Sequence, residues 1–196
     1  MDSRLVGYDD LLNRELTSGE RLLWNGMPAG GIHFRPGDVF AIPFSLLWGG
    51  FAIFWEYSVL HTPQAGGTRG FFALWGIPFV LIGLYLIAGR FFVDAYMRAR
   101  TRYAVTNQRV LILTTFAGQR VRSVSLRALG EMSLREWPGG TGTITFGSSP
   151  SFSFVALPGW PGANRNVAAA FELIEGARNV YDLIRKAQNT AVVRGG

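Results

Sequence analysis

An apolar stretch from Phe71 to Phe92 constrains this chain more than any other feature of its sequence. A helix needs about 20 mostly apolar residues to cross the roughly 30 Å hydrocarbon core of a bilayer, and this stretch is long enough. A second stretch of the same kind, Val39 to Leu60, precedes it. The sequence therefore predicts two transmembrane helices, over about 39–60 and 71–92, which form a helical hairpin.

The segments on both sides of this hairpin are too polar to lie in a bilayer, and this difference divides the chain of 196 residues. We expect an N-terminal segment over 1–37, the hairpin with a short external loop over 38–97, a second domain over 98–188 and a flexible tail over 189–196. The second domain has an ordinary domain size, and no room remains for another one.

Arginines predict the orientation of the hairpin, because basic residues flanking membrane helices are retained on the cytoplasmic side. The loop between the two helices carries only Arg69 as a full charge. The outer ends of the helices carry many more arginines, namely Arg35, Arg90, Arg98, Arg100, Arg102 and Arg109. Both termini are therefore expected in the cytoplasm. Residues 1–37 have mixed charge and do not resemble a cleavable signal peptide, so the first helix should remain in the mature protein.

Two features inside the predicted helices suggest contacts. Gly76, Gly83 and Gly89 recur at intervals of seven and six residues in the second helix. They fall loosely on one face and are candidates for packing against another helix, because glycine permits close approach. Glu56 lies about one turn from the end of the first helix. It either reaches the interface or forms a buried proton or ion site.

From Arg102 onward the residues alternate between apolar and polar, which predicts β-strands. The runs that read as strands are 103–106, 109–115, 119–126, 131–137, 141–146 and 151–157. Asn107-Gln108 is predicted to join the first two of these runs in a tight hairpin. The spacing is typical of a small antiparallel barrel or sandwich.

An amphipathic helix is predicted after the strands, because apolar residues recur at intervals of three and four. They are Phe171, Ile174, Ala177, Tyr181 and Ile184. Asn164 or Asn166 is placed to cap this helix. The fold class is therefore a membrane helical hairpin plus an α+β domain.

The sequence contains no pattern that predicts catalysis. It has no cysteine, and its two histidines, His33 and His61, are predicted on opposite sides of the membrane, so no metal site is expected. No cofactor motif is present either, and we expect a protein that is not an enzyme. The net charge of +6 is explained by cytoplasmic loops, and nucleic acid is not an expected partner.

Basic side chains next to the membrane are the main candidates for ligand contact. Arg35, Arg98, Arg100 and Arg102 could bind anionic headgroups, or could serve only to fix the topology. Arg120 and Arg122 alternate along one predicted strand. They could extend this patch or could be part of a solvated face.

Two sequence runs carry a resemblance to a known family. They are GERLLWNGMP from Gly19 to Pro28 and TRYAVTNQRVLIL from Thr101 to Leu113. The most specific residues are Tyr103, Thr106, Asn107 and Arg109. Together with the order of hairpin, strands and final helix, these runs resemble the bacterial pleckstrin-homology (PH) domain membrane proteins.

The resemblance implies a PH-like antiparallel barrel or sandwich of seven strands, closed at one end by the C-terminal helix. Five or six strands follow the hairpin, and Arg21 to Asn25 is a candidate for another. The resemblance also implies an inner-membrane protein that acts as a binding module, a scaffold or accessory subunit docking on another membrane protein. The alternative is recognition of anionic lipid headgroups. Trp24 is expected either at headgroup depth or packed on the PH-like domain.

Overall fold

The structure is a computed structural model that describes residues 11–34, 37–61, 68–116, 118–147 and 169–193. These divide into two compact units. The hairpin unit contains residues 31–96, and the strand unit contains residues 11–30, 97–147 and 169–193.

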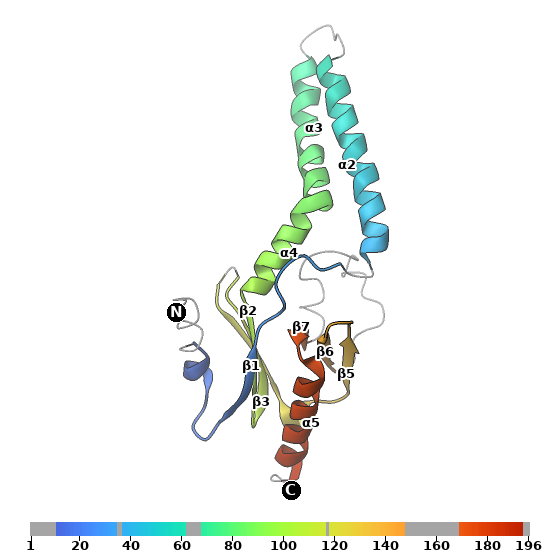
Figure 1. The fold of residues 1–196 in the computed structure, drawn as a ribbon. Coiled ribbons are helices and arrows are strands. Elements are labelled where there is room, and N and C mark those ends of the chain that lie inside the picture. Colours follow the sequence, from blue (N-terminus) through green and yellow to red (C-terminus); the bar gives the residue numbers. More distant parts are fainter. Residues whose placement is uncertain (1–10, 35–36, 62–67, 117, 148–168, 194–196) are drawn as a thin grey trace. The chain divides into compact units, whose positions relative to one another are not determined.

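The hairpin unit contains the two predicted apolar helices (Figure 1). The first is α2 (Asp38–His61), and the second is formed by α3 (Thr68–Leu84), a π-helical turn η1 (Tyr85–Gly89) and α4 (Arg90–Ala99). Both are long and apolar enough to cross a membrane by length and composition. The second helix continues to Ala99, beyond the apolar stretch, as the sequence suggests.

Small residues form the face on which α2 packs against α3, and the two helices lie side by side (Figure 1). The buried positions of α2 include Ser45, Gly49 and Ala52, which follow one another at intervals of four and three residues. The opposite stripe of α2 carries large exposed side chains, namely Phe40, Phe44, Leu47, Phe51 and Phe54. This distribution suits a helix that has one close neighbour and faces lipid elsewhere.

The first sheet of the strand unit is antiparallel and has the order β1-β2-β3-β4. Its strands are β1 (Leu22–Gly26), β2 (Thr101–Thr106), β3 (Arg109–Thr114) and β4 (Arg120–Ser125). The candidate strand before the hairpin is thus confirmed, because β1 pairs with β2 with Asn25 opposite Ala104. Residues 27–100, which include both apolar helices, therefore connect the first two strands of this unit.

The second sheet is also antiparallel and has the order β5-β6-β7. Its strands are β5 (Met132–Glu136), β6 (Thr141–Phe146) and β7 (Ala169–Glu175). A single 3₁₀ turn, η2 (Leu126–Ala128), follows β4, and helix α5 (Ala177–Val193) follows β7. The helix continues past Gln188, where the sequence suggests that a flexible tail begins.

The prediction that Phe171 and Ile174 belong to the final helix is wrong, because both lie in β7. A β-bulge explains why a strand imitates helical spacing here. Phe171 lies opposite Ile144 and Ile174 lies opposite Gly142, so β7 has one residue more than β6 between these pairs. Leu173, with φ of 50°, occupies the left-handed region within this bulge. The extra residue returns Ile174 to the buried face that Phe171 occupies.

The predicted closed barrel is not observed in the described part of the chain, where the strands form two separate sheets. The architecture there is an α+β arrangement of two antiparallel sheets and α5. The predicted strand over 151–157 and the candidate caps Asn164 and Asn166 lie outside the described residues.

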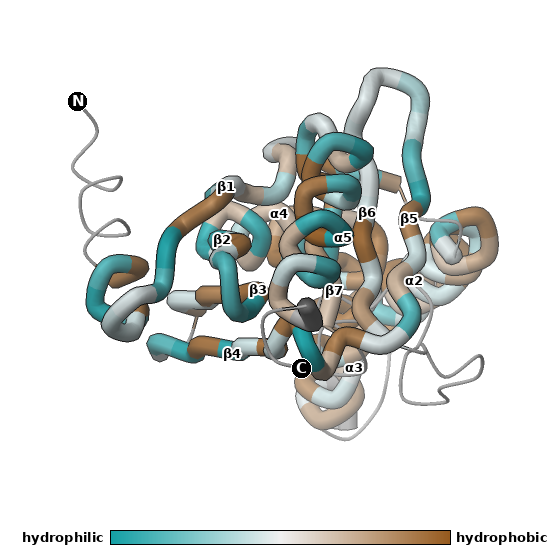
Figure 2. Tube along the Cα trace, turned by 90° about the horizontal axis from the view of Figure 1, so that it is seen from below, coloured by the Kyte–Doolittle hydropathy of each residue, from teal (hydrophilic) through white to brown (hydrophobic). Residues whose placement is uncertain are grey.

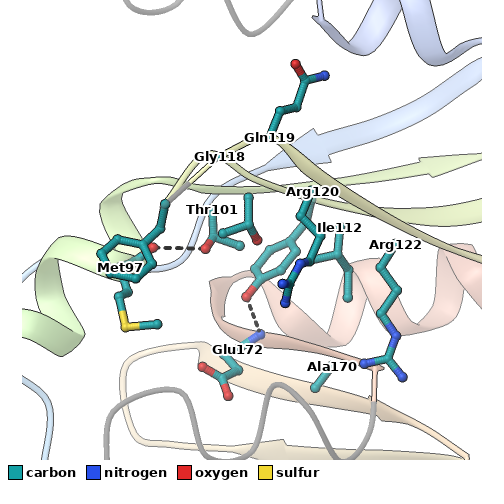
Figure 3. A pocket seen from close by; sticks show the side chains of 12 residues that line it. Met97, Thr101, Ile112, Gly118, Gln119, Arg120, Arg122, Ala170 and Glu172 are labelled. Atoms are coloured by element: carbon teal, nitrogen blue, oxygen red, sulfur yellow. Dashed lines mark hydrogen bonds between the residues drawn. The ribbon is translucent and has the colours of Figure 1, made fainter.

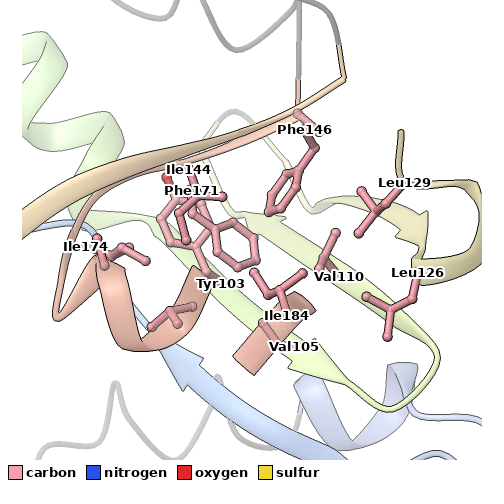
Figure 4. Packing of buried hydrophobic residues seen from close by; sticks show 13 residues of the cluster. Tyr103, Val105, Val110, Leu126, Leu129, Ile144, Phe146, Phe171, Ile174 and Ile184 are labelled. Atoms are coloured by element: carbon pink, nitrogen blue, oxygen red, sulfur yellow. The ribbon is translucent and has the colours of Figure 1, made fainter. Parts of the chain in front are cut away.

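The hydrophobic core of the strand unit lies between the two sheets and α5 (Figure 4). Phe171 is fully buried at its centre, where its ring lies 4.6 Å from that of Tyr103 and 5.0 Å from that of Phe146. Trp24 stacks on Phe171 at 5.8 Å, so it packs on the strand unit. Helix α5, along which polar and apolar residues alternate (Figure 2), contributes Ala177, Val180 and Ile184 to the same core.

Candidate functional site

The structure brings together the two sequence runs that carry the family resemblance. Glu20, from the first run, accepts two hydrogen bonds from the Arg109 guanidinium, from Nε at 2.9 Å and from Nη2 at 3.0 Å. The Thr106 hydroxyl donates to the same carboxylate at 2.7 Å. Asn107 accepts from the Arg21 backbone N–H at 2.8 Å. These residues fix the N-terminal segment to the β2–β3 turn, which is a structural role.

The environment of Glu20 strongly favours its ionised form. Burial of the carboxylate opposes ionisation, but the hydrogen bonds from Arg109, from the Thr17 backbone and from the Thr106 and Thr17 hydroxyls outweigh burial and lower its pKa to about 2. The hydrogen bonds that Arg109 donates to Glu20 in turn raise the pKa of Arg109. The pair therefore remains charged at any ordinary pH, and the proton exchange required of an acid or base catalyst is disfavoured.

Polar side chains also occur between the two apolar helices. Arg90 donates to Asp38 at 2.9 Å, and both side chains are buried, so this ion pair connects the start of α2 to the start of α4. Glu56 extends toward α3 and lies against Gly76, where a Cβ atom would come within 1.8 Å of Oε2. That oxygen is buried and has no hydrogen-bond partner among the described residues.

The predicted glycine face lies inside the hairpin. A Cβ atom on Gly83 would come within 2.8 Å of the Gly49 Cα, and Gly76 accommodates Glu56 as described above. The nearest atoms to a Cβ on Gly89 belong to Tyr85 of the same helix. Gly76 and Gly83 thus permit the two helices of one chain to approach closely, so the helix on which this face packs is α2 of the same chain.

This packing predicts that Gly83→Ala destabilises the hairpin, because its methyl group would meet backbone that cannot move aside. We expect a cost of about 1–3 kcal/mol, the usual range for overpacking. Gly50→Ala is the matched control, since a Cβ atom there would meet nothing within 4 Å. Thermal unfolding in mild detergent, followed by circular dichroism, should show a lower midpoint for Gly83→Ala only. Equal midpoints for the two variants would contradict the close approach.

The arginines proposed for lipid contact differ in their surroundings. Arg98 is 1 % exposed and donates to the Ala29 carbonyl at 3.2 Å, so it presents almost no surface to a headgroup. Arg102 is partly exposed and donates to the carbonyls of Ala99 and Thr101 at 3.5 and 3.2 Å, at the end of α4. Arg100 is also partly exposed, and Arg35 lies outside the described residues.

A cavity of about 390 Å³ lies in the strand unit, between the first sheet and β7 (Figure 3). Two cross-strand rows of the first sheet form one wall. Thr101, Thr114 and Arg120 form one row, and Tyr103, Ile112 and Arg122 form the other. Each row ends in an arginine on β4, which is the edge strand of its sheet. The cavity thus changes from an apolar floor to a basic rim.

The opposite wall of the cavity carries a carboxylate. Ala170 and Glu172 of β7 line it, and the Glu172 backbone N–H donates to the Tyr103 hydroxyl at 3.1 Å. Met97 and Phe116 complete the apolar part of the lining. The cavity volume falls within the roughly 300–1,000 Å³ that is usual for small-molecule sites. Its side chains can bind a charged group and an apolar group together.

Sequence reasoning identified only one side of this cavity. The alternation of Arg120 and Arg122 is visible in the sequence, and their cross-strand partners follow from the β3–β4 register. Glu172 was missed, because residues 171–184 read as one continuous helix. The sequence signal for Glu172 is Gly176, which has φ of 61° and directly precedes α5. A glycine at this position marks a break between a strand and the helix, and so places Glu172 in a strand.

Among the described residues, no group of three or more acidic or histidine side chains is placed to hold a metal ion. Comparison of the chain with protein-family models, with curated proteins and with solved structures found no match.

Proposed function

We propose that this protein is a membrane-anchored binding module, in which the strand unit is a PH-like domain that docks on another integral membrane protein. It would serve as a scaffold or an accessory subunit in the bacterial inner membrane, with both termini in the cytoplasm. Support for the proposal comes from the described residues, which form seven strands followed by a final helix. More arginines flank the outer ends of the two apolar helices than lie in the loop between them, and this asymmetry supports the orientation.

The connection between hairpin and strand unit is the observation that carries this proposal. Strand β1 precedes the first apolar helix and pairs with β2, which follows the second. Only Arg100 separates α4 from β2. Two neighbouring strands of one sheet are therefore each joined to a membrane helix by a short segment. A domain attached at two points can reach only targets near the membrane, which favours embedded partners and lipids.

Lipid recognition is the second candidate function, and the cavity favours it. The first two strands are connected by residues 27–100. Asn107-Gln108, which the sequence predicts as a tight hairpin turn, joins β2 to β3. Basic side chains at the rim of a partly apolar cavity are suited to an anionic headgroup.

Cysteine labelling tests the orientation on which both candidates depend. The chain has no natural cysteine, so single cysteines can be placed at Thr68, at the start of α3, and at the exposed Ser123 of β4. An impermeant thiol reagent should label only the Thr68 position in spheroplasts and both positions after lysis. Labelling of Ser123→Cys before lysis would overturn the orientation.

Photo-crosslinking tests docking. A photoreactive residue at Ser123 samples the edge of the first sheet, and one at Phe51 samples the outward face of α2. We expect a crosslink from Ser123 to one defined membrane protein, which should also migrate with the chain in native gels. Crosslinks from Phe51 alone would indicate that only the hairpin docks. A chain that migrates alone in every mild detergent, with no crosslink from either position, would contradict docking.

A further inference from the structure

The cavity of the strand unit has opposite charges on its two walls. Figure 3 shows the guanidinium groups of Arg120 and Arg122 on one side and the Glu172 carboxylate on another. We infer that this cavity binds the zwitterionic headgroup of a phosphatidylethanolamine-type phospholipid, with its phosphate at the arginines and its ammonium at Glu172. This inference rests on the proposed function only in that it requires the domain to work at a membrane.

The arginine side is suited to a phosphate. Arg120 and Arg122 are two residues apart on one strand, so their side chains leave the same face of the sheet. The Arg120 side chain is exposed and has no hydrogen bond or ion pair with any described residue, so its N–H donors are available. A guanidinium binds phosphate oxygens through two parallel N–H donors, and such charge-assisted bonds are the strong ones.

The carboxylate side selects among phosphates. Glu172 is 9 % exposed, and its backbone is held by Tyr103 next to the bulge at Leu173, so its position is fixed. A carboxylate in a poorly solvated wall repels a second negative charge and attracts a cation. It has acceptor sites for more than one donor, so it can bind an ammonium in addition to its protein contacts. A zwitterion therefore fits better than a headgroup with only negative charge.

The apolar lining and the chain connection point to a lipid as the source of this zwitterion. Met97, Ile112 and Phe116 offer an apolar surface beside the charged groups, which suits the glycerol and first acyl carbons of a phospholipid. Met97 belongs to α4, the helix that continues from the second apolar segment. A short covalent connection to the membrane gives a lipid headgroup a much higher effective concentration than a dissolved solute.

Binding of short-chain lipids to the full chain in detergent tests this inference. Titration calorimetry would compare phosphatidylethanolamine, phosphatidylglycerol and phosphatidylcholine with identical acyl chains, and also free phosphoethanolamine. The wild type should bind phosphatidylethanolamine about tenfold more tightly than the other two lipids. The ethanolamine ammonium donates N–H bonds to a carboxylate, and the choline group cannot. Free phosphoethanolamine should bind more weakly than its lipid.

Variants assign the two halves of the site. Arg120→Gln with Arg122→Gln should weaken all three lipids about 10- to 100-fold, while Glu172→Gln should remove the preference for phosphatidylethanolamine over phosphatidylglycerol. Arg135→Gln is the matched control, because Arg135 is an exposed arginine on β5, the edge strand of the other sheet. It should bind as the wild type does.

The wild-type lipid series decides the question even if a variant fails to fold. Equal affinity for phosphatidylethanolamine and phosphatidylglycerol would overturn the inference that the site prefers a zwitterionic headgroup. Equal affinity for phosphatidylethanolamine and free phosphoethanolamine would overturn the inference that the ligand is a lipid. Binding of none of these compounds would overturn the site altogether. In that case the crosslinks from Ser123 would still decide whether the domain docks on a protein.

Discussion

Replacing Phe171 by alanine should unfold the strand unit more readily than any other single truncation in its core. The Phe171 side chain is fully buried and contacts the rings of Trp24, Tyr103 and Phe146. These rings come from three different strands, so they cannot collapse together into the space that the lost ring leaves. We expect a cost of about 3–5 kcal/mol, the usual range for a buried Phe→Ala change.

Hydrogen exchange read by mass spectrometry measures this loss in the full chain, without excising the domain. Peptides from β2 and β6 should exchange about 10²- to 10⁴-fold faster in Phe171→Ala, since each 1.4 kcal/mol is a factor of ten. Phe116→Ala is the control, because Phe116 is 38 % exposed. Its peptides should exchange nearly as in the wild type. Unchanged exchange in Phe171→Ala would show that this ring does not hold the two sheets together.

The elements that could be predicted from the sequence are those set by local chemistry. Strand β6 was predicted with its observed ends, β3 within one residue and β2 within two, because their apolar residues alternate and turn-forming residues bound them. The apolar helices were predicted from length and composition alone. The bounds of these elements depend little on distant parts of the chain.

The start of the final helix could not be predicted from periodicity. Phe171 and Ile174 are three residues apart, which on a regular strand would place them on opposite faces. The bulge at Leu173 puts them on one face and so reproduces the spacing of a helix. The consequence for the candidate site is direct, because Glu172 lies within this bulge and faces the cavity.

The partners of the glycines were partly visible in the sequence. Ser45 and Gly49 are four residues apart in the first helix and form a small-xxx-small pattern. Gly83 packs against α2, and this tertiary contact cannot be deduced from the spacing of residues within one helix. The same holds for Asp38 and Arg90, which are distant in sequence and form a buried ion pair.

Glu20 joins distant parts of the chain in the same way, and its ionisation makes the strand unit sensitive to acid. Its pKa is about 2 in the folded protein, against an ordinary value of 4.5. A carboxylate whose pKa is lowered by folding stabilises the folded state fully above its ordinary pKa. This contribution is about 3 kcal/mol, since one pKa unit corresponds to about 1.4 kcal/mol. It should disappear progressively as the pH falls from about 4.5 to about 2.

Glu20→Gln should therefore remove stability at neutral pH and also remove part of its pH dependence. We expect a loss of about 2–3 kcal/mol at pH 7, less than for a fully buried pair, because the Arg109 side chain is 24 % exposed and water can solvate it. Denaturant unfolding in nonionic detergent at about pH 5 and about pH 3 would measure both effects.

Glu131→Gln serves as the control, because Glu131 is an exposed glutamate of the same unit. The wild type and this control should lose stability to the same extent on acidification, since other carboxylates titrate equally in both. Glu20→Gln should lose less, because the group that links N-terminal segment and β2–β3 turn through its charge is already neutral. If all three proteins showed the same decline in stability, the contacts of Glu20 with Arg109 and Thr106 would not lower the pKa of its carboxylate. The two sequence runs would then be held together mainly by the hydrogen bonds around Asn107.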